Sequence, residues 1–110
     1  MSTHSAPTTA YLRALAQQPP RFRLGRTMQT RGIVALDLGE EVCDLLMRHE
    51  RGDWGDLDAE DRQTNEAAIR PNPEECSRIL SAYQTAGGVK VWIITEHDRS
   101  VTTVLLPEEY

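Results

Sequence analysis

The chain has 110 residues, of which 39% are hydrophobic and 26% charged, and its formal net charge is −5. This length accommodates one domain with a modest core. The negative charge argues against a general nucleic-acid binder, because phosphate contacts supply most of that affinity. The sequence shows no signal-peptide pattern, no apolar run as long as a membrane span and only two cysteines, which predicts a cytoplasmic protein without membrane association.

The N-terminal residues are expected to form a flexible segment, 1–20, in front of a single domain, 21–110. Ser, Thr, Ala and Pro dominate the first ten residues, and two prolines close the segment. A short helix capped by Thr8 or Thr9 is an equal alternative within this segment, because apolar residues there recur at helical spacing.

A strand is predicted over Arg21–Thr30, where polar and apolar residues alternate imperfectly. Its arginines, with the rest of residues 1–36, make this third of the chain basic. They could line a groove for nucleic acid or for an acidic partner. The favoured interpretation is a solvated edge strand protected by charge, since few aromatic residues are interleaved for base stacking. The candidate binding residues here are Arg21, Arg23 and Arg26.

Helices are predicted in the middle of the chain. Thr30 can cap a first helix that ends near Gly39. The second, Glu40–His49, has one apolar stripe, with acids in its first turn and bases in its last. Asp58 can cap a third, thinly apolar helix that runs to about Arg70.

The final third predicts a three-stranded antiparallel meander over Arg78–Thr85, Val89–Glu96 and Val101–Leu106, rich in β-branched and aromatic residues. The middle strand is apolar on both faces, so helices should cover one face and a second subunit the other. The predicted fold class is therefore α+β, with an N-terminal strand and two to three short helices packed on a C-terminal three-stranded antiparallel meander.

The acidic loop around Trp54 is a second candidate binding site. Asp53 and Asp56 do not have the spacing of a calcium loop, so they are expected to be solvated. Trp54 either fills the core, which is favoured, or anchors a partner. The histidines and cysteines do not have zinc-ligand spacing, and Cys43 and Cys76 are expected to be reduced thiols, with a disulfide as the alternative. No metal and no cofactor is predicted.

The turn over residues 95–100 collects a histidine, an acid, an arginine and hydroxyl groups. A polar hairpin turn is the favoured interpretation. The alternative is a small ribonuclease-like or toxin-type domain acting on RNA, in which the sheet gathers groups that move a proton and stabilise phosphate charge. Its catalytic candidates are Arg78, His97, Arg99, Thr103 and His49.

Several runs of residues together resemble a family of short, uncharacterised bacterial "plasmid-related" proteins, some of which carry a label as type I restriction modification subunits. The runs are His49–Asp56, Asp61–Asn65, Arg78–Tyr83, Val91–Thr103 and Leu105–Tyr110. The resemblance implies a bacterial origin and no established activity. The sequence therefore predicts a non-enzymatic accessory or interaction domain, which binds a protein partner or a second copy of itself, with the ribonuclease-like domain as the alternative.

Overall fold

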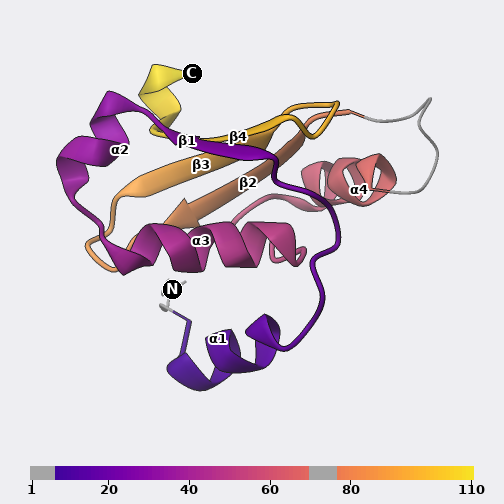
Figure 1. Cartoon of the computed structure of the whole chain (residues 1–110), viewed down its shortest axis with the longest axis horizontal. Coiled ribbons are helices and arrows are strands. Elements are labelled where there is room, and N and C mark those ends of the chain that lie inside the picture. The colour runs from indigo at the N-terminus through magenta and orange to yellow at the C-terminus, as the bar shows by residue number, and fades with distance from the viewer. Residues whose placement is uncertain (1–6, 70–76) are drawn as a thin grey trace.

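The computed structural model describes residues 7–69 and 77–110. Four strands form one mixed sheet in the order β1-β4-β3-β2 (Figure 1). The strands are β1 (Arg26–Gln29), β2 (Ile79–Gln84), β3 (Lys90–Thr95) and β4 (Val101–Leu105). The helices are α1 (Thr9–Ala16), α2 (Arg31–Leu36), α3 (Glu40–Glu50), α4 (Ala59–Ala68) and the 3-10 helix η2 (Pro107–Glu109). None of the helices in these two described segments is long and apolar enough to cross a membrane.

The helices lie mainly on one face of the sheet, here called the inner face (Figure 1). α3 runs along this face, and α1 packs on the side of α3 that points away from the sheet. α2 lies near one end of the sheet and α4 beside β2, whereas η2 lies against the opposite face, here called the outer face. α1 is the short helix that the sequence offered as an alternative within residues 1–20: the Thr8 side chain caps it, and its Leu15 is buried.

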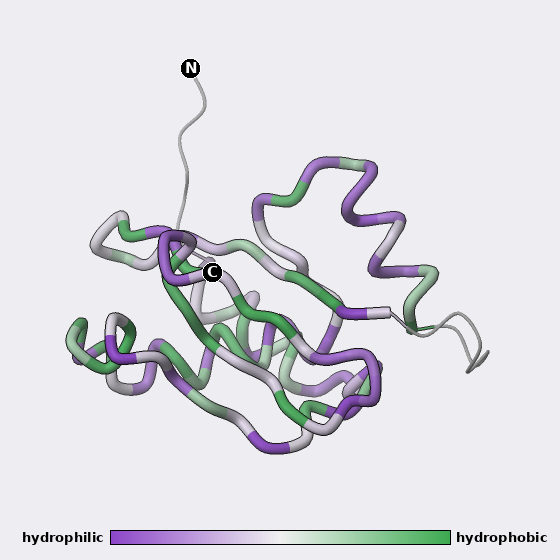
Figure 2. The backbone as a smooth tube through the Cα atoms, turned by 90° about the horizontal axis from the view of Figure 1, so that it is seen from above, coloured by the Kyte–Doolittle hydropathy of each residue, from purple (hydrophilic) through white to green (hydrophobic). Residues whose placement is uncertain are grey.

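The main core lies between α2, α3 and the inner face. Side chains alternate along each strand, so one set of residues from β2, β3 and β4 points toward α3. Figure 2 shows hydrophobic stretches along the strands of the meander, while α4 is mainly hydrophilic. The buried core residues are Ile33, Val42, Leu45, Tyr83, Val91, Ile93 and Val104.

The sheet differs from the predicted one in its fourth strand. β2, β3 and β4 are antiparallel neighbours in chain order, as a meander requires, but β1 pairs with β4 in parallel, so the sheet is mixed. The N-terminal strand is also shorter than predicted, since Arg21–Gly25 does not belong to it. Gly25 has a φ of 67°, and a Cβ there would lie 2.4 Å from the carbonyl oxygens of Arg99 and Ser100. This close approach ends the extended path before β1 begins.

Local capping sets the helix ends. Thr30 and Asp58 cap α2 and α4 through their side-chain oxygens. The helix after Thr30 was predicted to end near Gly39, but it ends at Leu36, because Asp37 takes the left-handed conformation with a φ of 51°. Gly39, with a φ of 61°, is instead the residue before α3.

Candidate functional site

Trp54 lies inside the protein and not on its surface. Its side chain is 3% exposed, its ring stacks on Phe22, and its Nε1 donates a hydrogen bond of 2.9 Å to Glu66. The loop that carries it is held by Asp53, which accepts hydrogen bonds from Arg48 Nε at 2.7 Å and from the Tyr11 hydroxyl at 2.9 Å. Trp54 and Asp53 therefore join elements of the fold, and neither presents a free side chain to a partner.

The pKa of Asp53 reports the same structural role. Burial by itself raises the pKa of this carboxyl group, but the hydrogen bond and charge of Arg48, together with hydrogen bonds from Tyr11 and the Gly55 N–H, hold the pKa below its ordinary value. Asp56, the third candidate of the loop, is exposed, and its backbone N–H donates to the Ala82 carbonyl at 2.7 Å.

His49 forms the centre of a buried polar network between α3 and the inner face. It is 0% exposed. Its Nδ1 lies 2.5 Å from Ser81 Oγ, and its Nε2 lies 2.9 Å from Thr95 Oγ1. Thr95 Oγ1 is 2.7 Å from Thr102 Oγ1, which donates to the Leu24 carbonyl at 2.7 Å. One helix, three strands and the segment before β1 are thus connected by hydrogen bonds.

The direction of these hydrogen bonds follows from their last member. A carbonyl can only accept, so the Thr102 hydroxyl donates to Leu24 and must accept from Thr95. The Thr95 hydroxyl then accepts from His49 Nε2–H. The other ring nitrogen, Nδ1, accepts from Ser81 in the neutral imidazole, which is the form that burial favours. Burial, with a smaller contribution from the positive charge of Arg99, lowers the pKa of His49 to about 3.

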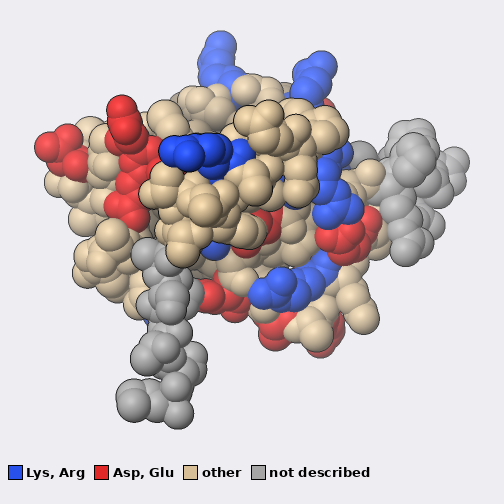
Figure 3. Space-filling view, turned by 90° about the horizontal axis from the view of Figure 1, so that it is seen from below, with Lys and Arg blue, Asp and Glu red and all other residues tan. Residues whose placement is uncertain are grey.

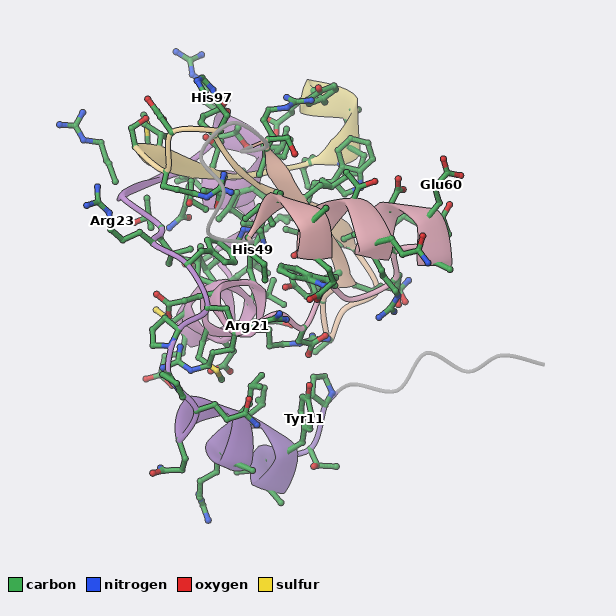
Figure 4. All side chains as sticks on the ribbon, turned by 90° about the vertical axis from the view of Figure 1, so that its right-hand side faces the viewer. Tyr11, Arg21, Arg23, His49, Glu60 and His97 are labelled. Atoms are coloured by element: carbon green, nitrogen blue, oxygen red, sulfur yellow. The ribbon has the colours of Figure 1, made fainter. Side chains whose placement is uncertain are left out.

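The other candidates of the ribonuclease alternative lie apart from His49. Figure 4 shows His97 at the periphery and His49 in the interior. The Arg99 guanidinium donates to the carbonyls of Ala68 at 2.7 Å and Ser77 at 2.8 Å, so it clamps the end of α4 to the β3–β4 turn. The Thr103 side chain lies on the outer face, which points away from α3.

The fifth candidate, Arg78, belongs to the outer face. Its guanidinium donates to the Tyr110 hydroxyl at 2.6 Å and lies 5.4 Å from the centre of that ring. The structure therefore does not bring the five candidates together in one concave site. His49 and Arg99 hold the fold, His97 is on an exposed turn, and Arg78 and Thr103 face the other side of the sheet.

The outer face carries an apolar row across all four strands. The register places Met28, Thr103, Ile94 and Leu80 opposite one another, and Leu105, Trp92 and Ala82 form the next row. The helices of the inner face do not reach these rows. η2 contacts β3 and α4 contacts β2, and Tyr110 lies edge-on to Trp92 at a centroid distance of 5.7 Å. Within the outer-face rows Ile94 and Leu105 are already buried.

The half-buried Trp92 lies between two hollows on this outer face and lines both of them. The larger hollow, of about 380 Å³, has Leu80 and Ile94 in its lining, with Asp61 and Arg78 as charged members. The smaller one, of about 210 Å³, lies toward β2 and has the charged members Asp56 and Lys90. Each hollow therefore combines an apolar lining that includes Trp92 with one acidic and one basic side chain.

The β2 edge of the sheet is closed. The Asn65 side chain donates to the Leu80 carbonyl at 2.6 Å and accepts from the Leu80 N–H at 3.1 Å, in place of a neighbouring strand. The Ala82 N–H donates to the Trp54 carbonyl at 3.1 Å. Asn65 was not identified from the sequence, because the apolar stripe of α4 is thin and no pattern distinguishes the buried Asn65 from the other polar residues of the helix.

The three candidate arginines differ in their partners. Arg21 forms a bidentate pair with Glu66, at 2.7 and 2.9 Å. No acidic side chain among the described residues pairs with Arg23 or Arg26. On the face seen in Figure 3, basic and acidic side chains are interspersed, and several basic ones stand out from the surface.

Comparisons of the chain with models of protein families, with curated proteins and with solved structures found no match. The resemblance to bacterial plasmid-related proteins therefore stays a prediction.

Proposed function

We propose that this chain is a non-enzymatic interaction domain that self-associates through the outer face of its sheet. The observation that supports this proposal is that Trp92 lines two neighbouring hollows on that face. Large aromatic side chains that stand next to apolar hollows are typical anchors of protein interfaces, because covering them removes apolar area from water.

The charges around the hollows favour a second copy as the occupant. Each hollow has one acidic and one basic side chain: Asp61 with Arg78, and Asp56 with Lys90. In a two-fold dimer the same surface meets itself, so a face with a single sign of charge would repel its copy, whereas a face with both signs can match opposite charges. The same symmetry places the Trp92 side chain of each copy against a hollow of the other.

Sedimentation velocity over a range of concentrations tests the proposal. The wild-type weight-average mass should rise with concentration toward twice the monomer mass, and Trp92→Lys should remain monomeric. Val34→Lys is the matched control, because Val34 is an exposed apolar residue, at 62%, that lies on α2 and lines neither hollow. A wild-type protein that stays monomeric at its highest soluble concentration, or a Val34→Lys variant that dissociates as Trp92→Lys does, would contradict the proposal.

A further inference from the structure

We infer that the free edge of β1 is a second binding surface, which accepts an extended acidic segment of a partner protein as an added strand. This edge lies outside the two hollows of the outer face, and its partner differs from the second copy proposed above. Two observations support the inference: the open backbone groups of β1 and the unpaired arginines that flank it.

The backbone of β1 leaves one row of hydrogen-bonding groups unused. The Arg26 N–H donates to the Ser100 carbonyl at 2.9 Å, and the Thr30 N–H donates to the Val104 carbonyl at 3.1 Å. In a parallel ladder, alternate residues bond to the same neighbour, so the N–H and C=O groups of Thr27 and Gln29 point away from β4. All four residues of β1 are exposed. The outward groups are therefore open to another chain.

The two edges of the sheet contrast with each other. At β2 the side chain of Asn65 and the backbone of Trp54 occupy the outward groups, as a neighbouring strand would. Nothing in the described parts of the chain does this at β1. An open edge favours unwanted pairing, and natural proteins usually close or protect it. A fold that closes one edge with a buried amide and leaves the other open has a site suited to strand addition.

Positive charge flanks the open edge. Arg23 precedes β1 by three residues, Arg26 is its first residue, and Arg31 follows its last residue by two. No acidic side chain of the described residues pairs with any of the three. Figure 4 shows the Arg23 side chain pointing away from the protein. At the far end of β1 the carboxylate of Glu109 is already engaged by the Gly32 N–H and the Thr30 hydroxyl.

These charges identify the kind of strand that fits. A second copy in a symmetric β1–β1 pair would bring its own arginines against Arg23 and Arg26, and like charges across an interface are costly. Single-stranded nucleic acid could pair with the arginines, but it would leave the outward backbone N–H groups of β1 unused. Proteins that bind single-stranded nucleic acid also rely on aromatic side chains that stack on the bases. The exposed aromatic residues among the described ones, Tyr11 and Tyr110, lie on α1 and after η2, away from this edge. An extended acidic peptide matches both the backbone groups and the charge.

The test uses a capped peptide of alternating Val and Glu, with the same peptide carrying Lys in place of Glu, and a short oligothymidylate. Binding is followed by fluorescence anisotropy and by amide exchange of the whole chain. The acidic peptide should bind, should slow exchange at Thr27 and Gln29, and should bind more weakly as salt is raised. The basic peptide should bind at least tenfold more weakly.

Two substitutions separate strand addition from charge attraction. Thr27→Pro removes one outward N–H without removing a bond to β4, which an edge strand tolerates. Thr27→Pro should lower the affinity for the acidic peptide at least tenfold. Thr27→Val, which keeps the N–H, should leave that affinity unchanged. Amide spectra that match the wild type away from β1 establish that the Thr27→Pro fold is intact. Equal binding by Thr27→Pro and Thr27→Val, or tighter binding of the oligothymidylate than of the acidic peptide, would overturn the inference.

Discussion

Acidification should destabilise this protein through His49. The neutral imidazole fits the buried network, where Nε2–H donates to Thr95 and Nδ1 accepts from Ser81. Its folded pKa, about 3, lies below its value of 6.5 in the unfolded chain. A base whose pKa is lowered by folding stabilises the protein fully above the unfolded pKa. That stabilisation is lost as the pH falls from 6.5 toward 3, since the unfolded chain then binds the extra proton.

The size of the effect follows from these two pKa values. Within the window each pH unit costs about 1.4 kcal/mol per proton. Because the unfolded imidazole is only partly protonated near pH 7, the free energy of unfolding should fall by about 2 kcal/mol between pH 7 and pH 5. Asp53 and Glu109, whose pKa values are lowered from 3.8 and 4.5, lose their stabilising effect mainly below this range.

Urea unfolding at pH 7, 6 and 5 measures this loss. The wild type and the control variant His97→Asn should both lose this stability between pH 7 and pH 5, because His97 is exposed and outside the network. His49→Gln should be less stable at pH 7 but should lose most of the dependence between pH 7 and 5. If the free energy of unfolding of His49→Gln falls with pH as steeply as that of the wild type, the assignment of His49 as the buried neutral base is wrong.

Three further predictions concern the frame of the fold. Asn65→Ala should cost about 2 kcal/mol in urea unfolding, since it leaves the Leu80 N–H and C=O without their partner; an unchanged midpoint would refute the closed edge. Gly25→Ala should cost at least about 2 kcal/mol in urea unfolding, because the new Cβ meets backbone oxygens at 2.4 Å and the residue keeps a φ of 67°; a stability equal to that of the wild type would show that the backbone does not approach this closely. Glu109→Ala should speed amide exchange at Gly32, and unchanged exchange there would show that the carboxylate does not cap α2.

The elements set by neighbouring residues were predictable from the sequence. Thr30 and Asp58 act on donors three residues away, so the starts of α2 and α4 follow from local chemistry. The apolar stripe of α3 and the turn between β2 and β3 are likewise set by residues only a few positions apart in the chain. Asp37 shows the limit of this reasoning, since its left-handed conformation ended α2 earlier than the glycine signal indicated.

Features that depend on distant residues were not predictable from the sequence. β1 pairs with β4 across about 75 residues of chain, and nothing near Arg26 indicates a parallel partner. His49 fits an apolar stripe by spacing, but its role depends on hydroxyl groups from two strands. The two faces of β3 were predictable, since alternation puts Val91 and Trp92 on opposite sides, and the structure places Trp92 on the face away from α3, where it lines both hollows. That a second copy covers this face stays a prediction.

The most direct test of self-association is an isotope-filtered NMR experiment on a mixture of labelled and unlabelled protein. It detects only contacts between different copies. The proposed interface predicts contacts from the Trp92 indole of one copy to residues of a hollow, such as Leu80 and Tyr110, of the other. Intermolecular contacts that fall on α2 or α3 and leave Trp92 without any, or no contacts at a concentration where the mass has doubled, would contradict the account.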